Sequence, residues 1–147
     1  MDSIHHNQTW ELVDLLDGRK LLPCKWVFRY KYASNSEKPK YKARLIAKGF
    51  RQEHGVDYDK IFSPVVKMTT LRLLLGVVMT EDLVLDQLDI KTTFLHGDLE
   101  DIYMSQSAGF TATGEESHLV CQLKKSLYGL KQALRMWYQK LYLITKT

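Results

Sequence analysis

Two runs of alternating residues constrain the fold of this chain more than any other feature of its sequence. Residues 24–33 and 40–48 each alternate with a period of two, which predicts two β-strands. The polar segment 34–39 between them predicts a turn, so the runs are expected to pair as a β-hairpin. One face of this hairpin is strongly cationic, through Lys25, Arg29, Lys31, Lys40, Lys42, Arg44 and Lys48.

The other face of the first run is aromatic, and two interpretations remain open for it. Exposed rings could stack on nucleic-acid bases. Aromatic residues at strand spacing are more often part of a core, and we expect a core role here. The residues concerned are Trp26, Phe28, Tyr30 and Tyr32.

The remaining patterns predict a mixed α+β fold. A helix is expected from an N-cap at Thr69 or Thr70 to about Asp82, and another from Lys131 to about Thr145. The mostly apolar residues 83–90 predict a buried strand between them. The first helix is expected to bury Leu71, Leu74, Leu75, Val78 and Met79. Further short strands are expected over residues 9–13, 102–104 and 119–123, with a polar loop over 105–118.

The net charge of +4 conceals a strong segregation along the chain. Residues 19–72 carry 14 Lys and Arg against four acids, whereas residues 81–101 carry seven acids and one Lys. A basic block of this kind suits a polyanion such as nucleic acid, although charged runs are often only solvated surface. Composition alone leaves these two explanations open.

Composition also excludes several classes of protein. The longest uncharged apolar run is residues 73–79, far below the roughly 20 residues that cross a bilayer. Residues 1–6 lack the basic and apolar regions of a secretory signal. Two cysteines are too few for a disulfide scaffold. We therefore expect an intracellular protein with two ordinary thiols and no membrane partner.

Asp89 is the residue that most suggests chemistry. It ends the predicted apolar strand, where a carboxylate is costly unless it is paired or bound to a metal. Mg²⁺ prefers such oxygen ligands, and two-metal phosphoryl-transfer sites use them. The alternative is that Asp89 caps the turn over residues 91–95, which is the commoner role for an Asp on local sequence alone.

Eight stretches, in order, together resemble the reverse transcriptase of copia-type LTR retrotransposons. The resemblance covers nearly the whole chain. A single stretch would be a weak indication of the family, but eight stretches in the right order and spacing are a specific one. The matching stretches are residues 9–13, 25–28, 41–50, 52 with 55–58, 62–67, 88–97, 102–104 and 126–133.

The resemblance implies one partial polymerase domain with a right-hand fold over residues 1–147. Residues 9–67 would form the fingers, and residues 68–147 an incomplete palm with a return to the fingers. Its implied partners are an RNA or DNA template-primer and a dNTP, and its implied cofactor is Mg²⁺, with Mn²⁺ as an alternative. The activity that it implies is RNA-directed DNA polymerisation.

The resemblance also implies roles for single residues. Lys42 and Arg44 would contact the triphosphate, with the division of that work between them left open. Asp89 would be the first catalytic aspartate and would ligate metal, helped by the carbonyl of Ile90. The remaining nucleotide-binding residues would be Phe94, under the sugar as a barrier to a ribose 2′-hydroxyl, and Tyr128 with Gly129, against the nascent base pair.

Three departures from the family pattern bear on activity. Leu134 and Ser107 stand where the pattern has prolines, and the second palm motif, Tyr-Val-Asp-Asp, does not occur in the 147 residues. We therefore expect a fragment that is inactive alone, with weak or no metal binding and self-association through an uncovered strand at residues 84–90. The rival interpretations are a noncatalytic nucleic-acid-binding remnant and an expressed fragment without function.

Overall fold

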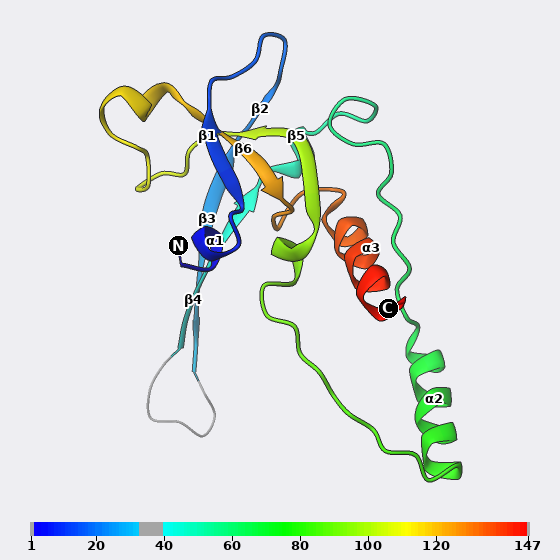
Figure 1. Cartoon of the computed structure of the whole chain (residues 1–147). Helices are drawn as coiled ribbons and strands as arrows, with labels where there is room; N and C mark the ends of the chain where they lie inside the picture. The colour runs from blue at the N-terminus through cyan, green and yellow to red at the C-terminus, as the bar shows by residue number, and fades with distance from the viewer. Residues whose placement is uncertain (1, 33–39, 147) are drawn as a thin grey trace.

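The computed structural model describes residues 2–32 and 40–146 and has a mixed α+β architecture (Figure 1). A four-stranded sheet in the order β1-β6-β5-β2 forms the body, and a two-stranded hairpin, β3-β4, extends from it. The α+β class expected from the sequence is confirmed. The strands of the body are β1 (Trp10–Val13), β2 (Leu21–Leu22), β5 (Asp98–Met104) and β6 (Val120–Lys125).

The core lies against the body sheet. β6 pairs antiparallel with both β1 and β5, and β2 pairs parallel with β5, so β5 and β6 are the two central strands. Their inward side chains pack with the segment that follows β6. The apolar area that this packing buries stabilises the fold. The largest fully buried apolar side chains are Leu22, Ile102, Met104, Leu123 and Leu127.

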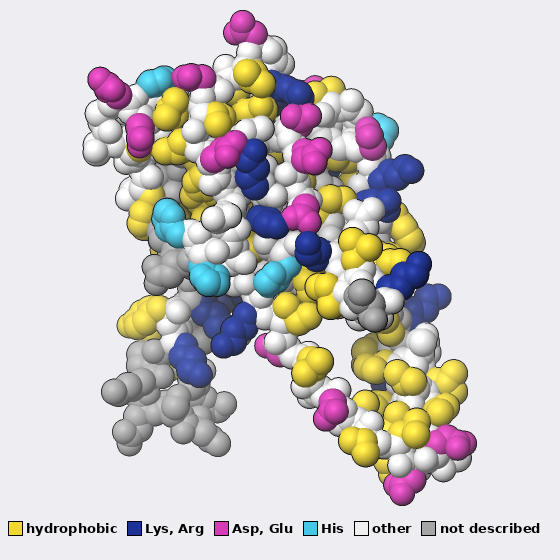
Figure 2. Space-filling view, viewed as in Figure 1, with side chains coloured by type: hydrophobic (Ala, Val, Ile, Leu, Met, Phe, Trp, Pro, Cys, Tyr) yellow, Lys and Arg dark blue, Asp and Glu magenta, His cyan; other side chains and the backbone are white. Residues whose placement is uncertain are grey.

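The hairpin forms in the register that the alternation predicts. β3 (Cys24–Lys31) and β4 (Lys40–Ala47) are antiparallel, and Arg29 lies opposite Lys42 while Val27 lies opposite Arg44. Directly opposed residues share a face of the ladder, so the basic residues of both strands lie on one side. Figure 2 shows basic side chains gathered beside the hairpin. The predicted turn at residues 34–39 lies outside the described residues.

The expectation that the aromatic face of β3 enters the core is wrong beyond its first ring. Trp26 packs against the core, but Phe28 is 75% exposed and Tyr32 is 85% exposed. The reason is position, because the hairpin leaves the body after Trp26 and nothing in the described chain covers the rings farther out.

The predicted buried helix and strand over residues 69–90 are the main errors of the sequence analysis. The helix forms as α2 (Met68–Thr80), but it buries no residue, and its N-cap is Lys67 without a side-chain cap bond rather than Thr69 or Thr70. Residues 83–90 form no strand; they run as an exposed, irregular segment with Val84 91% exposed. Figure 1 shows α2 standing away from the body sheet. The expected self-association through a strand edge at residues 84–90 loses its basis.

The second helix is confirmed as α3 (Ala133–Lys146), which packs on the body. Lys140 donates to Asp98 at 3.2 Å, and Lys125 pairs with the same carboxylate. The hydrogen bond from Lys125 outweighs the effect of burial and, with a smaller contribution from Lys140, lowers the pKa of Asp98. Gly97 abuts α3, since a Cβ there would lie 2.8 Å from the Cβ of Met136.

The smaller elements agree with the expected pattern only in part. The three short strands and the polar loop over residues 105–118 are confirmed, with a 3-10 turn, η3 (Gly114–His118), inside the loop. The pattern did not predict helix α1 (Asp2–His6), strand β2, or the 3-10 turn η1 (Gly49–Arg51). These elements are only two to five residues long and carry no periodicity to detect.

Both cysteines are free, as expected for ordinary thiols. Burial raises the pKa of the Cys24 thiol, and burial raises that of Cys121 to about 12. Both thiols therefore stay protonated at neutral pH. Among the described residues, no helix is long and apolar enough to cross a membrane.

Candidate functional site

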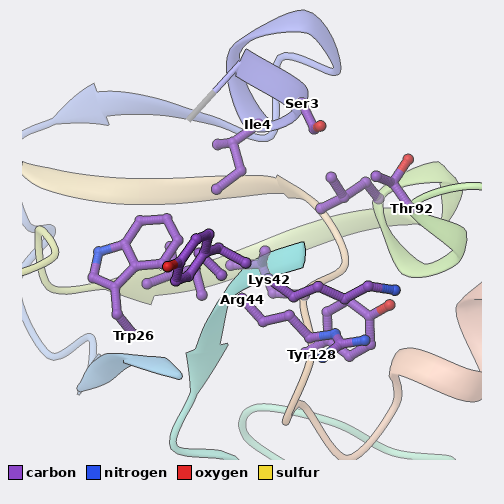
Figure 3. Close-up of a pocket in the computed structure, with 12 residues that line it drawn as sticks. Ser3, Ile4, Trp26, Lys42, Arg44, Thr92 and Tyr128 are labelled. Atoms are coloured by element: carbon purple, nitrogen blue, oxygen red, sulfur yellow. The ribbon is translucent and has the colours of Figure 1, made fainter. Parts of the chain in front are cut away.

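A cavity of about 350 Å³ lies where the hairpin meets the body, and it contains the predicted basic residues (Figure 3). Lys42 and Arg44 of β4 line one side, and Tyr128 lines another. The cavity is also lined by α1, by the first hairpin ring and by the turn after residue 91, through Ser3, Ile4, Trp26, Thr92 and Leu95. Segments far apart in the sequence thus meet at one hollow with positive charge at its edge.

Three of the predicted residues, Arg44, Tyr128 and Phe94, contact one another in a row. The guanidinium carbon of Arg44 lies 5.6 Å from the centroid of the Tyr128 ring. The ring of Phe94 meets Tyr128 edge to face, with 4.7 Å between the centroids. Such contacts each contribute roughly 0.5–1.5 kcal/mol and fix the orientation of the tyrosine. Phe94 therefore contacts the cavity through Tyr128 and does not line it directly.

Gly129 lets the segment after β6 approach the hairpin. It has φ +92°, and a Cβ there would lie 2.2 Å from the carbonyl oxygen of Ala47. Next to this contact, the amide of Ala47 donates a hydrogen bond to the carbonyl of Tyr128 at 2.9 Å. Gly49 makes the matching close approach, with its Cβ position 1.9 Å from the Gly129 carbonyl oxygen. Two glycines thus allow the backbone contact that places Tyr128 beside β4.

A polar network holds the neighbouring part of the chain in place. The Gln52 amide donates to Gln132 Oε1 at 3.0 Å, and the Gln132 amide donates to the carbonyl of Asp57 at 3.0 Å. Lys131 Nζ reaches both the Gln52 carbonyl at 3.2 Å and the Tyr58 hydroxyl at 3.0 Å. Buried polar groups that satisfy one another fix a single arrangement, so this network fastens residues 52–58 to the start of α3.

The turn that carries Phe94 has an unusual backbone. The 3-10 turn η2 (Thr93–His96) follows Thr92, which has φ +53° although it is β-branched. This left-handed conformation costs about 1–3 kcal/mol for such a residue. The turn is held by Thr93 Oγ1, which donates to the carbonyl of Ile90 at 3.0 Å, and by His96 Nε2, which lies 3.1 Å from the carbonyl of Lys91.

Asp89 lies outside this cavity, in the exposed segment before η2. Among residues 2–32 and 40–146, no three His, Cys, Asp or Glu side chains lie close enough together to hold a metal ion. The Ile90 carbonyl is already an acceptor for Thr93. One carboxylate and one carbonyl supply too few ligands for Mg²⁺, so the residues present do not form a metal site.

The structure therefore brings some of the predicted residues together and leaves others apart. Lys42, Arg44, Tyr128 and Gly129 lie at the cavity or directly behind it, and Phe94 supports it. Asp89 and Ile90 lie apart. The sequence analysis missed Thr92 and the α1 residues Ser3 and Ile4, because lining a cavity formed by distant segments leaves no local signal.

Comparisons of the sequence with known proteins identify its family. A family model described as reverse transcriptase (RNA-dependent DNA polymerase) matches residues 7–147. The retrovirus-related Pol polyprotein from transposon TNT 1-94 of Nicotiana tabacum is 54% identical over 141 residues, and that from transposon RE1 of Arabidopsis thaliana is 46% identical over 143 residues. Each alignment covers 95% of this chain and 10% of the relative.

A more distant relative, the transposon Ty1-DR4 Gag-Pol polyprotein of Saccharomyces cerevisiae, is 32% identical over 142 residues, which are 93% of this chain and 8% of the relative. The chain thus spans about a tenth of the length of the curated relatives it matches. No solved structure matches it.

Proposed function

The chain belongs to the reverse transcriptase family of copia-type retrotransposon Pol polyproteins, and from this premise we propose that it is a template- and dNTP-binding part of an RNA-directed DNA polymerase. In this proposal it adopts part of a polymerase right-hand fold. Residues 9–67 act as fingers, and residues 68–147 act as an incomplete palm with a return to the fingers. Its partners are an RNA or DNA template-primer and a dNTP.

The observation that carries the proposal is the meeting of Lys42, Arg44 and Tyr128 at one cavity. A triphosphate carries several negative charges, and Lys and Arg bind phosphate through charge-assisted hydrogen bonds. A flat phenol ring beside them offers a surface for a base or a sugar. In the proposed reaction, these residues hold the dNTP while a primer 3′-hydroxyl attacks its α-phosphate in line. A phosphodiester bond forms, the bond from the α-phosphorus to the bridging oxygen of the β-phosphate breaks, pyrophosphate leaves, and the hydroxyl proton passes to solvent.

We propose that Phe94 determines which nucleotide sugar can bind, and that it does so by positioning the ring of Tyr128. Its edge-to-face contact holds Tyr128 against the space that a ribose 2′-hydroxyl would need. Phe94 is also partly buried against the core, so a purely structural role would affect all nucleotides equally. The two explanations differ in one ratio, the affinity for a deoxynucleotide over that for a ribonucleotide.

Phe94→Ala is therefore expected to abolish discrimination between dGTP and GTP. The intact chain should prefer dGTP by roughly tenfold or more, because fitting or excluding one small group is worth about 1–3 kcal/mol. NMR titration of each variant with both nucleotides measures the ratio, with Phe94→Tyr as the control that keeps the ring. Affinities that fall in parallel with an unchanged ratio would assign Phe94 to the core alone.

The family implies a divalent metal, and Asp89 is proposed as one carboxylate ligand in a complete polymerase. The described residues do not complete such a site. A noncatalytic nucleic-acid-binding role is the second candidate function. It is favoured by the well-formed cationic face of the hairpin.

Primer extension by this 147-residue chain is expected to be absent with either Mg²⁺ or Mn²⁺. Two-metal phosphoryl transfer needs several carboxylate oxygens, and in the part of the chain that the structure describes Asp89 belongs to no group of three metal-binding side chains. Extension of a labelled primer on an RNA template should therefore be no higher for the chain than for Asp89→Asn. Robust extension that disappears in Asp89→Asn would contradict this and would indicate that another acid, such as Asp86 or Asp98, completes the site.

A further inference from the structure

We propose that helix α2 is a docking surface for a second copy of this chain, which packs against it as an antiparallel α2. The contact forms between the apolar faces of the two helices, with Lys67 of each copy beside Glu81 of the other. No residue of α2 lines the cavity at Tyr128, and the proposal does not depend on the function proposed for that cavity.

One face of α2 has the apolar spacing of a helix that pairs with another helix. Four apolar side chains recur at intervals of three, four and three residues, which is the spacing of a seam between two helices. They are Met68, Leu71, Leu75 and Val78. Met68 is 62% exposed and Leu75 is 39% exposed. Figure 2 shows apolar side chains gathered over α2, apart from the body. The face is therefore open to a partner.

The helix needs a packing partner to be stable. α2 has 13 residues, and isolated helices shorter than about 12–15 residues are marginal in water. A helix that is apolar on most of its circumference is normally buried, yet α2 buries no residue. Within the described chain no other element packs extensively against it (Figure 1). A second chain is the simplest source of the missing contact.

The charges at the two ends of α2 select the second copy and its direction. Lys67 is the N-cap, Glu81 is the C-cap, and Asp82 follows. Each charge lies at the end of the helix where the macrodipole makes it unfavourable. Among the described residues none of the three belongs to an ion pair. An antiparallel second α2 brings the acids beside Lys67 at both ends, whereas a parallel one would bring like charges together.

The backbone holds the acidic end of α2 in place. The amide of Leu83 donates to the carbonyl of Val78 at 3.0 Å, and the amide of Glu81 donates to the carbonyl of Val77 at 2.9 Å. Asp82 lies between them with φ +51°, the left-handed conformation that ends many helices. Both carboxylates therefore extend from a defined helix end rather than from a frayed turn, as an ion pair between two copies requires.

The contact is expected to be weak. Stable interfaces bury about 800 Å² on each partner, and one face of a helix about 20 Å long covers less than this. The dissociation constant should therefore be on the order of 10 µM. Sedimentation equilibrium between about 1 and 100 µM measures it. The helix content by circular dichroism should rise over the same range, because α2 is marginal in the monomer.

Two Leu to Asp substitutions on opposite faces of α2 test the apolar contact. Leu75→Asp puts a charge in the middle of the seam and should abolish association up to about 100 µM. Leu73→Asp is the matched control, because residue 73 lies about 160° around the helix from residue 75. Leu73 is 71% exposed, and this variant should associate as the intact chain does. Both positions are exposed, so neither change should unfold the body.

Charge reversal tests the antiparallel direction. Lys67→Glu should weaken association by roughly fivefold to tenfold, and Lys67→Glu/Glu81→Lys should restore most of it, because the exchanged pair attracts again. Arg72→Glu is the matched control. Arg72 lies near the middle of α2, where an antiparallel copy presents the same residue, so its reversal exchanges one pair of like charges for another. That variant should leave the dissociation constant nearly unchanged.

A dimer that Leu75→Asp abolishes, that Lys67→Glu weakens and that the double reversal restores would establish the contact. A chain that stays monomeric at about 100 µM would overturn the proposal and leave the face to a partner other than a second copy. Equal loss of association in Leu75→Asp and Leu73→Asp would reduce it to unspecific apolar aggregation. No loss in either would place the contact elsewhere on the chain, and a double reversal that recovers nothing would contradict the antiparallel direction.

Discussion

Gly129→Ala is expected to destabilise the chain by roughly 3 kcal/mol or more. At φ +92° a Cβ is strained whatever space surrounds it, at a cost of about 1–3 kcal/mol. Here the Cβ would also lie 2.2 Å from the backbone oxygen of Ala47 and 2.6 Å from Ile46 Cγ2. Relieving that overlap must move the segment that carries Tyr128 away from β4, at the cost of the Ala47 to Tyr128 hydrogen bond.

Urea denaturation followed by circular dichroism measures this loss, and Gly55→Ala is a matched control. Gly55 has φ +81°, yet nothing lies within 4 Å of its Cβ position, so that variant carries only the backbone strain. The difference between the two variants isolates the close approach at Gly129. Equal unfolding midpoints for Gly129→Ala and Gly55→Ala would show that the contact between the segment and the hairpin does not stabilise the fold.

The sequence predicted the hairpin better than any other element, because a strict period of two fixes both strand type and face. Lys42 and Arg44 fall on the cationic face by alternation alone, and the ladder confirms it. The same alternation could not decide whether the aromatic face was buried. Trp26 is packed and Phe28 is exposed because the body of the fold ends between them. The periodicity of a strand carries no information about how far the body that covers it extends.

The errors at residues 69–90 have a related cause. Leu74, Leu75 and their neighbours satisfy the apolar pattern of a buried helix, yet they remain exposed because no other described element packs on α2. Apolar content measures how much a segment gains from burial, not whether a partner is present. The argument that Asp89 ends a buried strand fails for the same reason.

The candidate site also has one part that the sequence could predict and one that it could not. The basic residues of the cavity could be found from the local pattern, but their contact with Tyr128 could not. Arg44 and Tyr128 are 84 residues apart in the sequence and meet only because Gly49 and Gly129 allow the backbones to touch. The resemblance to the family supplied Tyr128 and Phe94 as candidates, and their ring contact is consistent with it.

Lys42→Ala/Arg44→Ala is expected to have the largest effect on nucleic-acid binding. Each cation that neutralises a phosphate releases condensed counterions, so the logarithm of affinity falls with the logarithm of salt concentration in proportion to the number of contacts. Removing two contacts should lower the affinity and reduce the magnitude of that slope by about two. The effect should be uniform across sequences, because phosphate contacts carry no base information.

A matched control distinguishes the site from the overall charge. Lys67→Ala/Arg72→Ala also removes one Lys and one Arg, but from the N-terminal end of α2 and the residue before it, away from the cavity. That variant has the same net charge as Lys42→Ala/Arg44→Ala. It should therefore keep most of the affinity and nearly the full salt slope of the intact chain.

The salt titration of these three proteins against one RNA–DNA duplex with a single-stranded overhang tests the central claim, that the cationic face of β4 and its cavity form the nucleic-acid and nucleotide site. Anisotropy is read from low to physiological salt. We predict a steep slope for the intact chain, a similar slope for Lys67→Ala/Arg72→Ala, and a slope shallower by about two for Lys42→Ala/Arg44→Ala. Binding that does not depend on salt, or the same slope in both double variants, would contradict the claim.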